Sequence, residues 1–124
     1  MRKTNPGDKK ILIVEDEGDL CFLLELMLNK EHTSVDHVKS LAAAKDFLKE
    51  EKADLILLDN RLPDGLGLDF IPFVKENYPQ VRIVMISAKD RSAQDIALEN
   101  GADFFLAKPF TKDQLYQSVE SLLN

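Results

Sequence analysis

The stretch LILLDNRLPDG, residues 55–65, joins four unbroken apolar residues to the carboxylate of Asp59 and then to a polar, turn-forming segment. An apolar run without polar alternation is typical of a strand that is buried on both faces of a parallel sheet. The acid that follows either begins an ordinary loop or presents its carboxylate to a ligand at the end of the strand. The neighbouring segments of the chain decide between these two interpretations.

Strand-like and helix-like patterns alternate on both sides of this segment. The clearest helical stripe lies in residues 17–31 and consists of Leu20, Leu23, Leu24, Met27 and Leu28. Pro72 interrupts a second helical pattern, where it removes one backbone hydrogen bond and should bend the helix. The expected strands are 9–14, 33–38, 54–58, 81–87 and 104–107, and the expected helices are 17–31, 40–51, 67–78, 91–101 and 111–123.

Five strand–helix units in a row predict an α/β domain in which helices cover both faces of a parallel sheet. Because crossover connections are right-handed, the simplest arrangement is a flavodoxin-like, doubly wound, five-stranded sheet of order 2-1-3-4-5 with five helices. A chain of 124 residues has the length of one such domain. We expect the domain to occupy residues 9–124, after a flexible N-terminal lead-in at residues 1–8.

Composition limits the partners that this domain can have. A net charge of −6 disfavours binding to a nucleic-acid backbone, and no apolar run approaches the ~20 residues that span a bilayer. Cys21 is the only cysteine and cannot form an internal disulfide, so a reducing cytoplasm is the expected compartment. His32 and His37 are interpreted as solvated strand histidines, because the sequence places no cysteine or second acid beside them at ligand spacing.

Charged and polar side chains follow the expected strands where each strand ends. Since the carboxyl ends of parallel strands share one edge of the sheet, these side chains should lie together. Three carboxylates in one place repel each other, and a hard cation such as Mg²⁺ removes that conflict. A hydroxyl and an ammonium beside them could hold a phosphoryl group carried on a carboxylate. The residues concerned are Glu15, Asp16, Asp59, Ser87 and Lys108.

At these residues the chain resembles the receiver domain of bacterial two-component response regulators. The similarity covers about residues 9–123, and in size the chain is similar to the stand-alone receivers of chemotaxis and phosphorelay pathways. The motifs that carry the resemblance are ILIVEDE (11–17), DLILLDNRLPDGLG (54–67), VMISA (84–88) and GADFFLAKPF (101–110).

The resemblance implies that Asp59 accepts a phosphoryl group from a phosphohistidine of a sensor kinase or histidine phosphotransfer protein. It implies a Mg²⁺ site in which Asp16 and Asp59 bind the ion directly, Glu15 acts through water, and the Arg61 backbone carbonyl is a further ligand. Lys108 and Ser87 would contact the phosphoryl oxygens. Phe105 falls at the switch aromatic position, and the Lys108–Pro109 bond is commonly cis in the family.

Such a domain is a phosphoacceptor switch with single-turnover self-phosphorylation and autodephosphorylation, and it acts on a downstream protein target. Glu15 stands where the family commonly has aspartate, and metal binding should survive this change. Arg61 and Lys89 flank the path of a hydrolytic water, so they either alter the lifetime of the phosphorylated state or are solvated surface charges. On the first helix, Phe22 and Leu26, with Cys21, lie off the predicted stripe, so they either form a docking patch for the kinase or phosphotransfer protein or are incidentally exposed apolar residues.

Two other functions remain open at this point. A Mg²⁺-dependent phosphohydrolase could use Asp59 as its nucleophile, but such enzymes carry a second aspartate two residues later, where this chain has Arg61, which cannot act as a general acid. A phosphate-independent scaffold is the other alternative. It is disfavoured because the acids, the hydroxyl and the lysine are all present.

Overall fold

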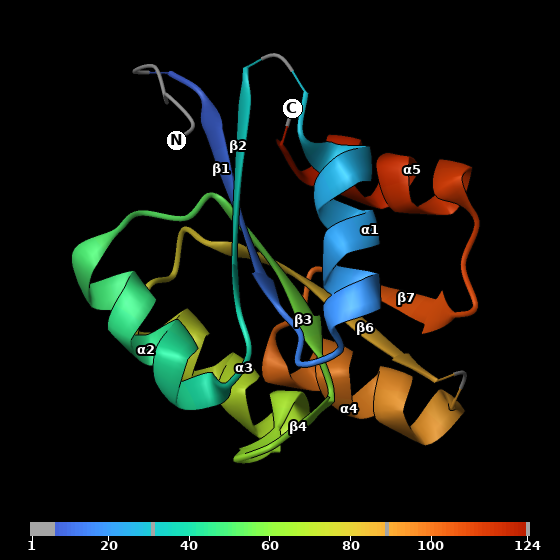
Figure 1. The fold of residues 1–124 in the computed structure, drawn as a ribbon. Coiled ribbons are helices and arrows are strands. Elements are labelled where there is room, and N and C mark those ends of the chain that lie inside the picture. The colour runs from blue at the N-terminus through green and yellow to red at the C-terminus, as the bar shows by residue number, and fades with distance from the viewer. Residues whose placement is uncertain (1–6, 31, 89, 124) are drawn as a thin grey trace.

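The computed structural model describes residues 7–30, 32–88 and 90–123, and its centre is a five-stranded parallel sheet (Figure 1). The strand order is β2-β1-β3-β6-β7, which confirms the predicted order 2-1-3-4-5. The strands of this sheet are β1 (Lys9–Val14), β2 (Thr33–Val38), β3 (Leu55–Asp59), β6 (Arg82–Ala88) and β7 (Phe104–Lys108). The helices are α1 (Gly18–Leu28), α2 (Leu41–Glu50), α3 (Gly67–Asn77), α4 (Arg91–Asn100) and α5 (Lys112–Leu123).

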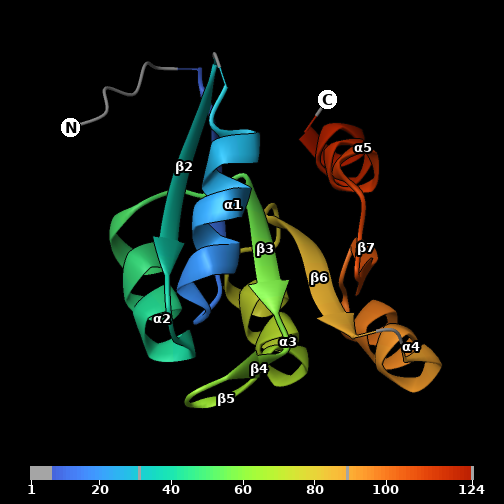
Figure 2. The same cartoon turned by 45° about the vertical axis from the view of Figure 1, so that its right-hand side comes forward.

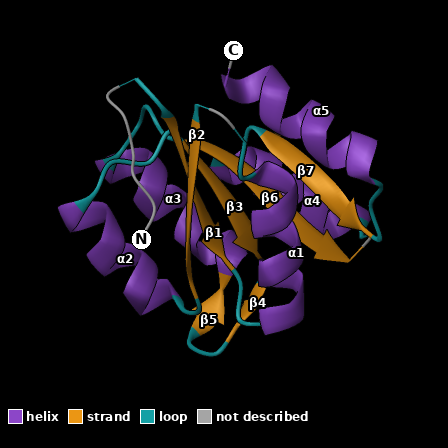
Figure 3. Ribbon diagram, turned by 45° about the horizontal axis from the view of Figure 1, so that its top comes forward, coloured by secondary structure: helices purple, strands orange, loops and turns teal. Residues whose placement is uncertain are grey.

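Helices cover both faces of the sheet, so the central strands are buried on both sides (Figure 3). Leu12 and Ile56 face α2, α3 and α4, whereas Ile11 and Leu57 face α1 and α5. All five residues of β3 are buried, which agrees with the unbroken apolar run in the sequence. None of the helices in the described part of the chain is long and apolar enough to cross a membrane.

The predicted stripe of α1 is wrong in part. Cys21, which was expected on the outer side, is buried with Leu24 and Leu28, whereas Leu23, which was expected inside, is half exposed. The buried spacing of three and four residues forms a helical face by itself. Because α1 is apolar on most of its sides, the sequence pattern fits two rotations of the helix, and packing against the sheet selects one. The helix also ends at Leu28 rather than at residue 31.

A short antiparallel hairpin that the sequence analysis did not anticipate follows β3. It consists of β4 (Arg61–Leu62) and β5 (Gly65–Leu66). At its turn, the two carboxylate oxygens of Asp64 accept hydrogen bonds of 2.9 Å from the backbone amides of Leu41 and Ala42 at the start of α2. The hairpin is therefore held to α2, which Ser40 caps as expected by accepting a bond from the Ala43 amide.

Pro72 lies inside α3, and the helix continues through it. Proline has no amide hydrogen, so the Leu68 carbonyl loses the partner that it would have within the helix. The side-chain amide of Asn100, at the end of α4, donates to this carbonyl at 2.9 Å. The hydrogen bond that Pro72 removes within α3 is thus replaced by one between α3 and α4.

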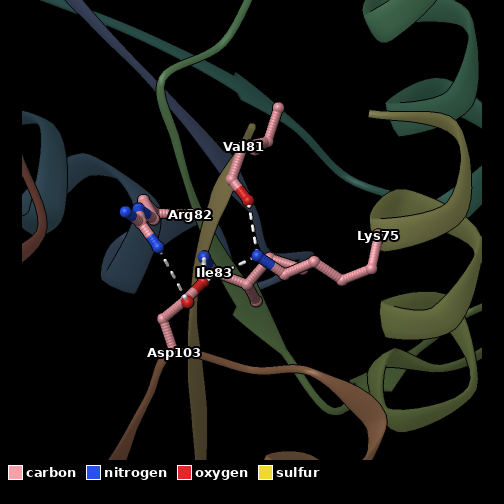
Figure 4. Close-up of polar contacts among 5 residues, drawn as sticks. All are labelled: Lys75, Val81, Arg82, Ile83 and Asp103. Carbon is pink, nitrogen blue, oxygen red and sulfur yellow. Dashed lines mark hydrogen bonds and ion pairs between the residues drawn. The ribbon is translucent and has the colours of Figure 1, made fainter. Parts of the chain in front are cut away.

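Lys75 connects α3 to the start of β6 and to the residue before β7 (Figure 4). Its ammonium donates to the Val81 carbonyl and to Asp103 Oδ2, both at 2.8 Å. Asp103 also accepts a bond from the Ile83 amide at 2.9 Å, and Arg82 lies 3.4 Å from its second oxygen. Because the Lys75 and Asp103 side chains are only about a fifth exposed, each depends on the other to satisfy its charge.

We expect the substitution Lys75→Ala to lower the free energy of unfolding by about 1–3 kcal/mol, because it removes the ammonium donor from the partly buried Val81 carbonyl and one of the donors from the Asp103 carboxylate. Urea denaturation of the purified domain measures this change. Lys49→Ala, at an exposed lysine of α2, is the matched control. An equal loss in the two variants would show that the contacts of Lys75 add nothing to stability.

Candidate functional site

The candidate site lies at the edge of the sheet where the parallel strands end, beside the β4–β5 hairpin (Figure 2). Asp59 is the last residue of β3, and Lys108 is the last residue of β7. The strand β6 lies between them in the sheet. Lys108 extends across it, and its Nζ is 3.0 Å from Asp59 Oδ1. The structure therefore brings together two side chains that are 49 residues apart in the sequence.

Two further carboxylates complete an acidic cluster beside this ion pair. Glu15 and Asp16 directly follow β1, and oxygen atoms of Glu15, Asp16 and Asp59 lie within 4.8 Å of one another. Glu15 and Asp59 are buried, with 4% and 8% of their surfaces exposed, whereas Asp16 is exposed. Carboxylate oxygens in a partly open cluster are the ligands that Mg²⁺ prefers. The donor set thus fits a magnesium site.

The electrostatic conflict within the cluster falls on Glu15. Burial, followed by the charge of Asp59, raises the pKa of Glu15 from 4.5 to about 7, and the positive charge of Lys108 opposes this change. The backbone amide of Glu17 donates to Glu15 Oε1 at 3.2 Å and also favours the charged form. Two buried carboxylates beside one lysine leave a negative charge that a cation would balance.

The loop after Asp59 is closed tightly against the end of β3. The Gly67 amide donates to the Asn60 carbonyl at 2.7 Å, and the Leu68 amide donates to Asn60 Oδ1 at 3.1 Å. A Cβ atom at position 67 would lie 2.3 Å from the Asp59 carbonyl oxygen, which is closer than two non-bonded atoms can approach. Only glycine therefore allows the first residue of α3 to pack this closely against the backbone carbonyl of Asp59. The sequence analysis did not single out either Asn60 or Gly67.

The other predicted site residues differ in how far they are exposed to solvent. Ser87 is partly buried near the end of β6, and Phe105 is partly buried against the core on the α3 and α4 side. Arg61 is exposed on β4. Phe22 and Leu26 are 65% and 63% exposed on α1. Lys89 lies outside the described residues, as do residues 1–6 of the expected N-terminal lead-in. The Lys108–Pro109 peptide bond is cis, as the resemblance implies.

Nearly the whole chain matches one protein family. The family model of the response regulator receiver domain matches residues 11–120, nearly the whole chain. The chain belongs to this family. As a receiver domain it is part of two-component signalling, in which such domains typically serve as phosphoacceptor switches rather than turnover enzymes.

Individual relatives support the same assignment. Response regulator protein PilR from Pseudomonas aeruginosa is 37% identical over 118 residues, which make up 93% of this chain and 26% of that protein. The receiver domain therefore spans about a quarter of the length of this curated relative.

Solved structures extend the similarity to the fold. A two-component response regulator from Clostridium difficile is 28% identical and has a TM-score of 0.87, covering 93% of this chain and 95% of that chain. The beryllofluoride-activated NtrC4 receiver domain dimer is 32% identical, with a TM-score of 0.86 and coverage of 91% and 94%. These relatives share the sheet and helices that place the receiver's acidic cluster.

The raised pKa of Glu15 predicts how stability depends on pH when divalent ions are removed with EDTA. The native state holds a proton on Glu15 that the unfolded state has lost between pH 4.5 and 7. The stability that this proton contributes is fully present below pH 4.5 and is lost as the pH rises through 7. Glu15→Gln cannot lose a proton, so its stability relative to the unchanged protein should increase as the pH rises.

Thermal denaturation of both proteins across this pH range measures the difference. Glu99→Gln, at an exposed acid of α4, shows the effect of removing a carboxylate far from the cluster. A difference between Glu15→Gln and the unchanged protein that stays constant with pH would contradict the assigned pKa.

Proposed function

We propose that this receiver domain accepts a phosphoryl group from a phosphohistidine of a sensor kinase or histidine phosphotransfer protein onto Asp59, in a Mg²⁺-dependent reaction. The observation that carries the proposal is the 3.0 Å contact between Lys108 Nζ and Asp59 Oδ1, next to the carboxylates of Glu15 and Asp16. Phosphoryl transfer depends on positioning and charge neutralisation more than on further covalent chemistry from the protein. The acidic cluster and Lys108, at the ends of the parallel strands, offer both the positioning and the charges that this reaction needs.

The step is a displacement at phosphorus. A carboxylate oxygen of Asp59 attacks the phosphorus atom, the bond between phosphorus and the imidazole nitrogen breaks, and the nitrogen keeps the electron pair. The product is an acyl phosphate on Asp59. Lys108 then pairs with a phosphoryl oxygen, and the Ser87 hydroxyl donates to another. Asp16 and Asp59 would hold Mg²⁺ directly, with Glu15 acting through water and the Arg61 carbonyl as a further ligand, and the ion would supply positive charge that offsets the charge of the transferred group.

The phosphorylated state then favours a second arrangement of Ser87 and Phe105. A phosphoryl group adds about −1.5 to −2 charges at neutral pH, which draws the Ser87 hydroxyl toward it. Phe105 is only partly buried, so its ring can change position without opening the centre of the core. Such a local change of charge that biases a two-state element is a physical basis for switching partner binding.

The donor protein docks beside the acidic rim, on α1. Phe22 and Leu26 lie one helical turn apart and are largely exposed, and the half-exposed Leu23 extends the same apolar surface. Grouped apolar side chains on an otherwise polar surface are typical of protein interaction sites. Because α1 begins four residues after β1 ends, the helix that carries this patch starts beside Glu15 and Asp16 of the acidic cluster.

The proposal predicts that Mg²⁺ and acetyl phosphate will add one base-labile phosphoryl group to the domain. Asp59→Asn should abolish the adduct, because an amide cannot replace the attacking carboxylate. Intact-protein mass spectrometry, before and after treatment with base, measures the modification. Asp64→Asn is the matched control and should retain the adduct, because the Asp64 carboxylate caps α2 instead of joining the acidic cluster.

Two outcomes would overturn the proposal. An adduct that persists in Asp59→Asn would place the phosphoryl group elsewhere, and no adduct at all would favour a phosphate-independent scaffold. Steady release of phosphate from phosphate esters would instead favour a phosphohydrolase.

Arg61 and Lys89 are expected to alter the lifetime of the acyl phosphate, because they follow Asp59 and Ser87 by two residues each in the sequence. The double variant Arg61→Ala, Lys89→Ala should change the rate at which the isolated phosphorylated domain loses its phosphoryl group. The half-life of the acyl phosphate, followed by mass spectrometry in an EDTA-free buffer with excess Mg²⁺, measures this rate. An unchanged half-life would leave both residues as solvated surface charges. Arg82→Ala, at the opposite edge of the sheet, is the control.

A further inference from the structure

Three side chains with metal-binding atoms meet between α1 and the edge strand β2, which lie side by side (Figure 1). Cys21 and Glu25 are one turn apart on α1, and His37 lies on β2. His37 Nδ1 is paired with Glu25 Oε1. Ligand atoms of all three residues lie within 4.8 Å of one another. The interpretation of His37 as a merely solvated histidine is therefore incomplete, because the fold supplies the cysteine and the acid that the local sequence lacks.

The chemistry of these donors differs from that of the acidic rim. A thiolate, an imidazole nitrogen and a carboxylate oxygen together are typical of Zn²⁺ sites and unlike the all-oxygen sites that Mg²⁺ prefers. Bonds of about 2.0–2.3 Å to a tetrahedral zinc ion place the ligand atoms roughly 3.3–3.8 Å apart. The three ligand atoms lie within 4.8 Å of one another, so small side-chain movements would bring them to this spacing.

Access to the site is from solvent on one side. The side chains of Glu25 and His37 are 35% and 39% exposed, whereas Cys21 is buried beneath them. The exposed pair can change rotamer to approach an ion, while the packed helix and strand hold the sulfur in place. Three protein ligands and an exposed outer side leave a fourth coordination position for water.

We propose that Cys21, Glu25 and His37 form a binding site for a borderline divalent transition-metal ion, with Zn²⁺ as the expected occupant. On binding, the Cys21 thiol releases its proton to solvent as sulfur bonds to the metal. His37 would bind through a ring nitrogen that carries no proton, so a proton on that nitrogen would move to the other ring nitrogen or to solvent. The site joins α1 to β2 and is independent of phosphoryl transfer at Asp59.

Cobalt substitution tests the sulfur ligand directly. One equivalent of Co²⁺ added to the reduced, metal-stripped domain should produce the near-ultraviolet charge-transfer band of a cobalt–thiolate bond, and Zn²⁺ should remove the band. Cys21→Ser should lack it. Calorimetric titration with Zn²⁺ should give one ion per chain, and His37→Gln should lose more than the roughly 10- to 100-fold in affinity that follows loss of an outer-shell partner.

Three controls separate this site from others on the domain. His32→Gln changes the chain's other histidine, which is not part of the proposed site, and should leave the affinity for Zn²⁺ unchanged. Asp59→Asn and a large excess of Mg²⁺ should also leave it unchanged, because they affect only the acidic rim. Since His37 is exposed, His37→Gln should keep the fold. Circular dichroism checks the fold of both ligand variants, His37→Gln and Cys21→Ser.

Specific results would overturn the proposal. They are the absence of a charge-transfer band in the unchanged domain, a band that persists in Cys21→Ser, or Zn²⁺ binding that is lost in Asp59→Asn. The last result would assign the ion to the acidic cluster. Neither of the other results bears on phosphorylation of Asp59, which the acetyl phosphate experiment measures separately.

Discussion

The 3.0 Å contact between Lys108 and Asp59 is possible only because β3, β6 and β7 run in the same direction and end at one edge of the sheet. The register places Asp59 opposite Ile86 and Lys108 opposite Ala88, so the lysine side chain has only β6 to cross. Without this cation, two buried carboxylates would face each other in a region of low polarity. The apolar strands and the charged rim are therefore one arrangement, since the sheet that buries the core also brings the opposing charges together.

Much of this arrangement could be predicted from the sequence, because two simple patterns determine it. The unbroken apolar run 55–58 indicates a doubly buried strand, and five strand–helix repeats indicate parallel pairing. Once the strands are parallel, the residues that follow them must share an edge of the sheet, so the sequence alone places Glu15, Asp59 and Lys108 in one group. Their opposite charges are brought together by their positions at the strand ends, so the grouping needs no knowledge of side-chain conformations.

Other features depend on contacts that no local pattern contains. The rotation of α1 was misjudged at Cys21 and Leu23, because apolar residues on several sides of a helix allow more than one buried face. The β4–β5 hairpin was missed since two-residue strands have no periodicity to detect. The approach of His37 to Cys21 arises from the packing of α1 beside β2, and it joins residues whose separation in the sequence matches no metal-binding motif.

The contact between Asn100 and the Leu68 carbonyl makes positions 72 and 100 epistatic. With proline at position 72, the carbonyl has no partner within α3 and depends on the amide from α4. With alanine there, the ordinary helical bond would return and Asn100 would lose its main role. The effects of substitutions at the two positions on stability are thus non-additive. How well either position tolerates a change depends on which residue is present at the other.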